Sequence, residues 1–144
     1  MANGGDYASI SESDLVADYE EIFGDAESSD VNFFIGGALT SANSKTVIDV
    51  AAARKDVVAF TSVPVSSVTN TTTVQTAVDA AVSWASSSNA DSSYGVLTGT
   101  AVYVYDKYND VNRYVSPAGL IAGLCCYTDD VADAWFSPAG FNRG

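Results

Sequence analysis

The stretch that decides the fold is VNFFIGGALTSANSKTVIDVAAARKDVVAFTSVP, residues 31–64. Its two ends, 31–37 and 57–64, are short apolar runs rich in β-branched and aromatic residues, which is typical of buried strands. Between them, residues 41–56 place apolar side chains on one side of a helix and basic residues at its C-terminal end, where the helix dipole favours them. A strand, a helix and a second strand of these lengths predict a βαβ crossover between parallel strands.

The pattern continues beyond this unit. Residues 71–89 form the clearest predicted helix, because apolar residues recur there at a spacing of about 3.6, at Val74, Ala77, Val78, Ala81, Val82 and Ala85. Residues 94–99, YGVLTG, read as a third strand. Alternating strands and helices predict an α/β fold, a three-layer-like and mostly parallel sheet with flanking helices.

Further elements are predicted at both ends. Residues 101–117 alternate in the manner of two strands around the turn-rich DKYND and predict an appended β-hairpin. A helix through 118–127 follows, and a second short helix is expected at 129–135 with Thr128 as its N-cap. Residues 1–30 read as an acidic lead-in that contains an amphipathic helix, and 31–144 as the α/β domain.

Charge is concentrated at the beginning of the chain. Residues 1–30 hold nine of the 18 acidic residues and no lysine or arginine, in a protein of net charge −12. Such a surface repels phosphate backbones and anionic lipid, so nucleic acid and membrane are not expected partners. The acidic face is either a solvated helix or a surface that meets a basic partner.

Residue types that carry chemistry are scarce. The chain has no histidine, and its two cysteines, Cys125 and Cys126, are adjacent and therefore poorly placed for a disulfide framework. The segment IGGALTSANSKT lacks the second glycine of a phosphate-binding loop. Acidic and amide residues at 106–112 and 129–133 are better explained by turn and capping chemistry than by a metal site. We expect no catalytic residue, no cofactor and no metal.

Tyrosines mark the predicted hairpin. Four of the eight fall within 103–114, where they serve either protein–protein contact or cross-strand packing. The chain ends on the aromatic and glycine-bearing segment WFSPAGFNRG, residues 135–144.

The last fifty residues carry a specific resemblance. Three blocks, Tyr105–Asp110 (YDKYND), Ile121–Cys125 (IAGLC) and Trp135–Gly144, resemble the central part of contractile-tail sheath proteins of T4-like myoviruses. The earlier α/β portion is similar to the same family but less distinctive, so that the likeness covers about residues 15–144.

The resemblance implies a structural role with no cofactor and no active site. Other sheath subunits and a tail tube protein are the implied partners, in a virion tail assembled in the host bacterial cytoplasm. It also implies that the C-terminal part of the family domain is missing and that the isolated fragment could be monomeric. The candidate subunit-contact residues are Tyr105, Tyr108, Tyr114, Trp135, Phe136, Phe141 and Arg143.

Two expectations concern the end of the chain: Trp135 and Phe136 fold back on the domain, and residues 141–144 lie near its surface. Two other functions stay open. One is a small α/β enzyme or ligand-binding domain with its site at the strand-end loops, where open α/β sheets bind ligands. The other is an acidic mimic that occupies a basic partner through residues 1–30.

Overall fold

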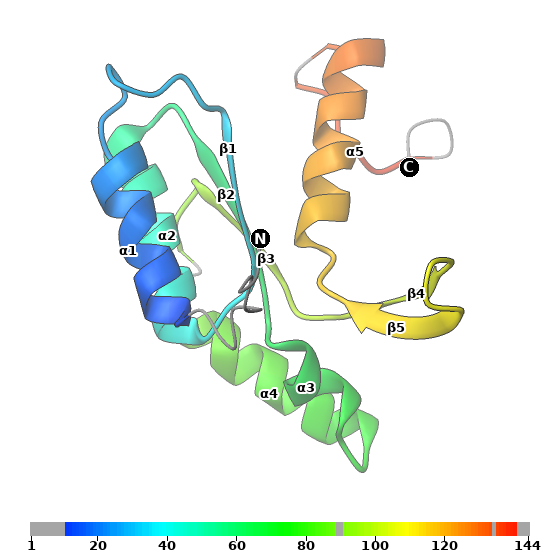
Figure 1. The fold of residues 1–144 in the computed structure, drawn as a ribbon. Helices are drawn as coiled ribbons and strands as arrows, with labels where there is room; N and C mark the ends of the chain where they lie inside the picture. Colours follow the sequence, from blue (N-terminus) through cyan, green and yellow to red (C-terminus); the bar gives the residue numbers. More distant parts are fainter. Residues whose placement is uncertain (1–10, 89–90, 134, 141–144) are drawn as a thin grey trace, which may run out of the picture.

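The computed structural model of the chain describes residues 11–88, 91–133 and 135–140 (Figure 1). It confirms the predicted α/β class, with a parallel sheet, helices on both of its faces and an appended antiparallel pair. In chain order the elements are α1 (Glu12–Phe23), β1 (Phe33–Ala38), α2 (Ser41–Arg54), β2 (Val58–Ser62), α3 (Val65–Thr69), α4 (Val74–Ser87), β3 (Gly95–Thr98), β4 (Val102–Asp106), β5 (Val111–Val115) and α5 (Ala118–Val131).

The parallel sheet has the order β1–β2–β3. Phe34 of β1 pairs with Ala59 of β2, and Ala59 pairs with Gly95 of β3. The connection through α2 joins β1 to β2, and α3 with α4 joins β2 to β3. The first of these connections is the crossover that residues 31–64 predict.

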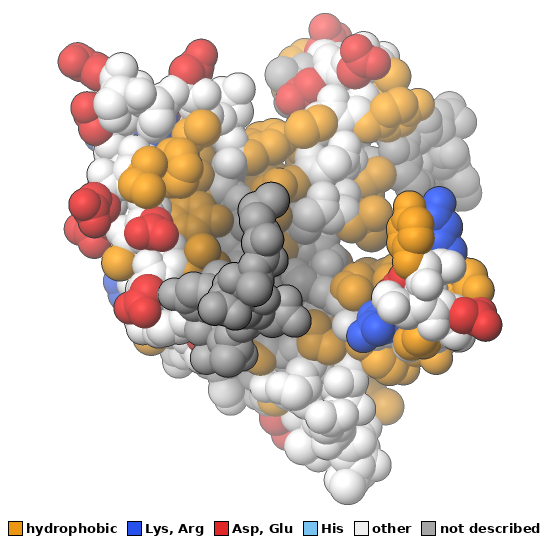
Figure 2. All heavy atoms as spheres, in the orientation of Figure 1, with side chains coloured by type: hydrophobic (Ala, Val, Ile, Leu, Met, Phe, Trp, Pro, Cys, Tyr) orange, Lys and Arg blue, Asp and Glu red, His pale blue; other side chains and the backbone are white. Residues whose placement is uncertain are grey.

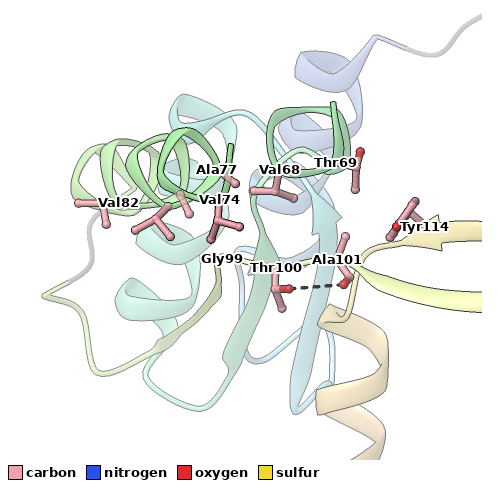
Figure 3. A pocket seen from close by; sticks show the side chains of 11 residues that line it. Val68, Thr69, Val74, Ala77, Val82, Gly99, Thr100, Ala101 and Tyr114 are labelled. Carbon is pink, nitrogen blue, oxygen red and sulfur yellow. Dashed lines mark hydrogen bonds between the residues drawn. The ribbon is translucent and has the colours of Figure 1, made fainter. Parts of the chain in front are cut away.

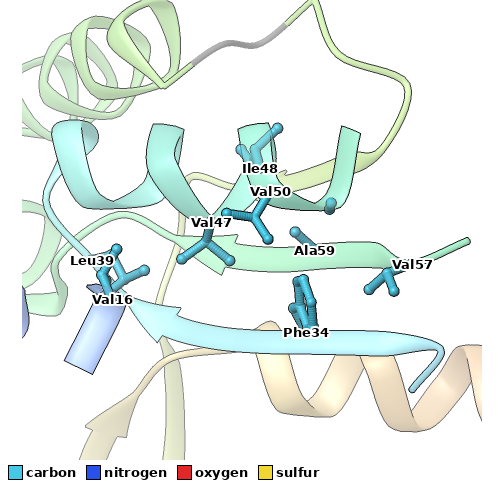
Figure 4. Packing of buried hydrophobic residues seen from close by; sticks show 9 residues of the cluster. Val16, Phe34, Leu39, Val47, Ile48, Val50, Val57 and Ala59 are labelled. Carbon is cyan, nitrogen blue, oxygen red and sulfur yellow. The ribbon is translucent and has the colours of Figure 1, made fainter. Parts of the chain in front are cut away.

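One face of the sheet is covered by α2 (Figure 4). Phe34 and Ala59 point from β1 and β2 toward this helix, which contributes Val47, Ile48 and Val50 to the same buried cluster. Each of these side chains is less than a tenth exposed. The apolar side predicted for the helix within 41–56 is therefore the side that meets the sheet.

The opposite face of the sheet is covered by α5. Successive strand residues point to opposite faces, so Phe33 and Phe60 face α5 while their neighbours face α2. Phe60 is 1% exposed and packs with Ala118 and Ala122 of α5. The rings of Phe33 and Phe60 meet edge to face with centroids 5.1 Å apart. Together with the α2 side, this gives the three layers that the sequence predicts.

Helix α1 packs along α2 and the free edge of β1. Tyr19 lies edge to face against Phe34, with ring centroids 5.2 Å apart, and Phe23 completes the aromatic group. The Tyr19 hydroxyl donates a hydrogen bond to the carbonyl of Ile35 at 3.1 Å, and burial raises the pKa of this phenol. The outer side of α1 carries acidic side chains (Figure 2).

Arg54, at the end of α2, ties the segment after α1 to the core. Its side chain is almost fully buried and donates to the carbonyls of Phe23 at 2.7 Å and Ser29 at 2.9 Å. It also pairs with Asp56 at 2.7 Å, and this hydrogen bond lowers the pKa of the Asp56 carboxyl. One cation thus satisfies two carbonyls and a carboxylate.

Two predictions about helices need correction. The short helix α3, whose five residues follow directly on Pro64, is absent from the sequence prediction. The separate helix at 129–135 is wrong, because α5 runs without interruption through Thr128 to Val131. The Thr128 hydroxyl donates back to the carbonyl of Leu124 at 2.8 Å instead of capping a new helix.

Candidate subunit-contact surfaces

The β4–β5 hairpin forms a sheet of its own, away from the parallel sheet (Figure 1). Tyr103 pairs with Tyr114 across the strands, with ring centroids 4.6 Å apart. Every residue of β5 is exposed. Two-stranded hairpins are marginally stable by themselves in water, and here β5 also contacts α3.

The turn is organised by Asp106. Its carboxylate accepts hydrogen bonds from the backbone N–H groups of Tyr108 at 3.1 Å and Asn109 at 3.3 Å, and from the Asn109 side chain at 2.7 Å. Arg113 adds an ion pair at 3.2 Å. The hydrogen bond from the Asn109 side chain is the largest of the effects that lower the pKa of Asp106. This is the turn chemistry expected for these residues.

Tyr105 is held by Asp110, at the other end of the turn. Its hydroxyl donates to the carboxylate of Asp110 at 2.6 Å, which raises the pKa of the Tyr105 phenol. Asp110 has a φ of 53°, in the left-handed region that aspartate tolerates better than most residues. The hydrogen bond orients the ring of Tyr105 and leaves it exposed.

Both faces of the hairpin carry apolar groups. Strand alternation places the tyrosines of β4 and β5 on one face and their valines on the other. The valine face consists of Val102, Val104, Val111 and Val115, with the Asp106–Arg113 pair beside them. An exposed element that is apolar on two sides is typical of a surface that another protein covers.

Trp135 and Phe136 form a second exposed group, beyond α5. Their rings stack with centroids 4.4 Å apart, and Trp135 is 78% exposed. The backbone N–H of Phe136 donates to the carbonyl of Asp133 at 2.9 Å, which shapes the turn. The expectation that Trp135 folds back on the domain is therefore wrong, because this indole packs on its neighbour and leaves most of its surface in solvent.

The structure places the predicted contact residues in two groups. Tyr105, Tyr108 and Tyr114 lie together on the hairpin, and all three are exposed. Trp135 and Phe136 form the separate pair described above, while Phe141 and Arg143 lie outside the described residues.

A further exposed surface was missed at the sequence level. The apolar stripe of α4 does not face the core: Val74, Val78 and Val82 are exposed, and Trp84 is the only residue of this helix that is less than a tenth exposed. The Trp84 indole N–H donates to the carbonyl of Leu39 at 2.8 Å and thereby anchors α4 to the sheet. Helical spacing was the available signal, but it does not tell a stripe that faces the core from one that faces a partner.

The two glycines near the end of β1, Gly36 and Gly37, are explained by backbone conformation and close packing. The pairing of β1 with β2 shifts register between Ile35 and Gly37, where Gly37 has a φ of +73°. A Cβ on Gly36 would lie 2.9 Å from the Leu39 side chain, so this position favours glycine for lack of space. Lys45, which follows on α2, is ion-paired with Asp49. These contacts favour a structural reading of the segment over a phosphate-binding one.

Polar side chains at the carboxyl end of β2 bond to serines of α2 and of the segment after β5. Ser44 and Thr61 share a hydrogen bond of 2.8 Å, and Ser62 and Ser116 share one of 2.7 Å.

Burial is the main cause that raises the pKa of the Cys125 thiol, which makes it a poorer nucleophile. Among the described residues, no group of three or more acidic or cysteine side chains is arranged to hold a metal ion. Within the same part of the chain, no helix combines the length and apolar character needed to cross a bilayer.

Comparison with known proteins gives a consistent result. No protein-family profile matches the chain. The tail sheath protein of Enterobacteria phage T4 is 38% identical over 152 residues, which takes in 95% of this chain and 23% of the T4 protein. This chain belongs to the phage tail sheath protein family.

Two other tail sheath proteins are also similar to parts of this chain. The tail sheath protein of Vibrio phage KVP40 is 61% identical over 56 residues, 39% of this chain and 8% of that protein. The tail sheath protein of Salmonella phage ViI is 37% identical over 100 residues, 69% of this chain and 16% of that protein. The chain thus spans less than a quarter of the length of these relatives.

Proposed function

We propose that this chain is a structural domain of a contractile tail sheath subunit. In this role it packs against other sheath subunits around a tail tube and exchanges inter-subunit contacts when the tail contracts. It belongs in the virion tail, after assembly in the host bacterial cytoplasm. The observation that carries the proposal is the 38% identity with the phage T4 tail sheath protein over 95% of the chain.

The distribution of polar groups supports a structural role over an enzymatic one. Open α/β sheets bind ligands outside the carboxyl ends of their strands. Here Thr61 and Ser62, at the end of β2, are fully buried and bonded to Ser44 and Ser116. No ionisable side chain takes part in these two hydrogen bonds. The carboxyl end of the central strand β2 is therefore occupied by groups that hold the fold together.

The exposed aromatic groups are the proposed contacts. Tyr105, Tyr108 and Tyr114 on the hairpin present rigid amphipathic rings, a residue type enriched at protein interfaces. Trp135 and Phe136 form the second contact group. Phe141 and Arg143 remain proposed contacts from the sequence. The net charge of −12 is unfavourable for binding nucleic acid or anionic lipid, which leaves proteins as the partners.

A chimeric sheath tests the proposal. This chain replaces the matching segment of the phage T4 tail sheath protein, and negative-stain electron microscopy compares the chimera with the unmodified T4 protein under the same conditions. We expect the chimera to form the same rings or tubes, because the exchanged segment supplies an equivalent domain.

A folded chimera that forms no ordered particles, under conditions where the T4 protein does, would contradict the proposal. Circular dichroism and a cooperative thermal transition establish that the chimera is folded. A thermal-shift screen of this chain with nucleotides and divalent metals examines the alternative, since a ligand that binds the native state raises Tm. A rise of several degrees would favour a ligand-binding domain.

A further inference from the structure

The sequence of α1 gives this helix little stability of its own. Residues 12–25 contain six carboxylates and no basic side chain. Asp14 and Asp18 are four positions apart, where like charges destabilise a helix. Ser11 occupies the N-cap position but makes no side-chain capping hydrogen bond. Isolated helices shorter than about 12–15 residues are marginal in water, so α1 depends on its contacts with the rest of the fold.

Those contacts bury few side chains of α1. Val16 is the one residue of this helix that is less than a tenth exposed, whereas α2 has five such residues. Leu15 and Ile22 remain exposed although they are apolar. Tyr19 and Phe23 are half-buried and pack against the edge of the α2-side core. The helix is therefore held by a narrow apolar strip.

Open hollows lie on two sides of α1. One, of about 260 Å³, is lined by Tyr19 and Phe23 and by residues of β1. The other, of about 650 Å³, is lined by carboxylates from both neighbouring helices, Glu20 and Glu21 of α1 and Asp49 of α2. Side chains that border a hollow have no packing partner on that side. The packing of α1 is therefore looser than that of a core helix.

Single hydrogen bonds fasten α1 at its start, middle and end. The backbone N–H of Thr40 donates to Oε1 of Glu12 at 2.6 Å. The Tyr19 hydroxyl donates to the carbonyl of Ile35 at 3.1 Å. Arg54 donates to the carbonyl of the last residue of the helix at 2.7 Å. Because each point is held by so few atoms, the loss of one bond should loosen the whole helix.

What α1 covers is the free edge of β1. The backbone N–H of Val58 donates to the carbonyl of Asn32 at 3.0 Å, and the residues that bond to a neighbouring strand alternate along a parallel strand. Phe33 and Ile35 therefore direct their backbone groups away from β2, and Tyr19 meets this row at the Ile35 carbonyl. No side chain of β1 is charged. An uncovered apolar edge of this kind invites pairing with other chains.

Helix α4 differs from α1, although it too is largely exposed. Val74 and Val82 lie beside an open groove between α3 and α4 (Figure 3). The Thr73 side chain caps α4 by accepting from the backbone N–H of Thr76 at 3.2 Å, and α3 and α4 together join β2 to β3. Helix α1 precedes β1 and connects no two strands of the sheet (Figure 1). It can leave without breaking a connection between strands.

We propose that α1 is a detachable strap, which opens as one unit while the parallel sheet stays folded. When closed, the strap protects the free edge of β1 from pairing with other chains. The inference concerns the folded chain by itself and does not depend on the sheath role.

Native-state amide hydrogen exchange of the 144-residue chain, measured by NMR, tests the opening. We expect the amides of 16–23 to share one opening equilibrium and to be protected at least about tenfold less than those of β2. Their exchange should also respond less steeply to low urea, because a local opening exposes less surface than global unfolding. Equal protection of α1 and β2 would overturn the inference. A protection that only decreases gradually toward the start of α1 would indicate fraying and would overturn it too.

Tyr19→Phe loosens the strap without removing its ring. The lost hydrogen bond to Ile35 should lower the protection factors of α1 by about threefold to tenfold and leave those of β2 within about twofold. Tyr127→Phe, at an exposed tyrosine of α5, is the matched control and should change neither set. Near-UV circular dichroism establishes that both variants keep the native core. Equal changes in α1 and β2 would show that α1 does not open separately.

Asp18→Lys should tighten the strap. It converts a like-charge pair with Asp14 into an opposite-charge pair, which should raise the protection factors of α1 by about twofold or more. Asp91→Lys makes the same change in net charge at an exposed position before β3 and is the control. An equal rise in both variants would mean that net charge, and not the charge pattern of α1, governs the opening.

Thioflavin T fluorescence tests the protective role, because this dye reports strand pairing between chains. We expect Tyr19→Phe to develop fluorescence about threefold or more faster than the wild-type chain at the same concentration, in step with its more frequent opening. Tyr127→Phe should match the wild-type chain. A Tyr19→Phe chain that opens more often but gains fluorescence no faster would overturn the protective role.

Discussion

The parallel sheet and the β4–β5 hairpin show two ways in which one chain uses strands. The sheet is covered by α2 on one face and by α5 on the other, and the central strand β2 is almost entirely buried. The hairpin alternates just as regularly, yet all of β5 is exposed and both of its faces are partly apolar. Alternation alone therefore does not reveal whether a strand's partners lie within the chain or outside it.

The strongest test of this contrast compares the loss of one side chain from the parallel sheet with the loss of one from the hairpin. Phe60→Ala removes a ring that is 1% exposed and packed between Phe33 and α5, and we expect it to cost about 3–5 kcal/mol in the free energy of unfolding. Tyr108→Ala, at a position that is 86% exposed, should change this free energy by less than about 0.5 kcal/mol. Urea denaturation followed by circular dichroism measures both. Similar values for the two variants would remove the distinction.

Arg54 should have the next largest effect. Arg54→Ala leaves the carbonyls of Phe23 and Ser29 without their donor, and we expect Tm to fall by about 5 °C or more. Lys45→Ala is the matched control, since Lys45 forms an exposed ion pair with Asp49 on the same helix and such pairs contribute little. Differential scanning calorimetry compares the two, and a control that is as destabilised as Arg54→Ala would show that burial of the cation is unimportant.

Two residues with positive φ should respond in opposite directions. Gly37→Ala puts a side chain where φ is +73° and should destabilise the fold by about 1 kcal/mol. Lys55 ends α2 with a φ of 67°, so Lys55→Gly relieves strain and should stabilise the fold by about 0.5–1 kcal/mol. Paired denaturation curves give the sign of each change. The same sign for both would mean that backbone conformation does not dominate at these positions.

The smallest effect is confined to the hairpin. Hydrogen bonds, first that from Asn109, lower the pKa of Asp106 below its ordinary value of 3.8. A carboxyl with a depressed native pKa stabilises the folded hairpin above that ordinary value, and this contribution is lost as pH falls through the depressed one. We expect amide resonances of 106–113 to broaden or shift in that acidic range and in Asp106→Asn at neutral pH. The resonances of β1–β3 serve as the internal control, and equal changes in both sheets would contradict a local effect.

The parts of the fold that the sequence predicts are those with a partner close in the chain. The βαβ unit follows from residues 31–64, because one face of each apolar run there is buried by the helix between them. The turn at Asp106 likewise follows from local side chains that bond to nearby backbone. The prediction of a separate helix at 129–135 was wrong because a threonine hydroxyl can either cap a new helix or bond back within an existing one. Thr128 does the latter.

The candidate contacts depended on information that local pattern does not contain. The stripe of α4 has the spacing of a core-facing helix, but the sheet is already covered by α2, and α4 is anchored mainly through Trp84. Trp135 was expected to fold back on the domain, whereas the structure shows it stacked on Phe136 and 78% exposed. An apolar surface stays exposed when other elements already cover the core, and local sequence does not show which elements do so.

The two tryptophans of this chain sit in opposite surroundings, and that gives the molecule a pair of built-in optical reporters. Trp84 is 7% exposed and bonded to Leu39, so its emission should be blue-shifted and should report loss of the native core. Trp135 is open to water, so its emission should be red-shifted and should move only when another surface covers the indole. A single emission spectrum can therefore distinguish unfolding from association, because the two events act on different fluorophores.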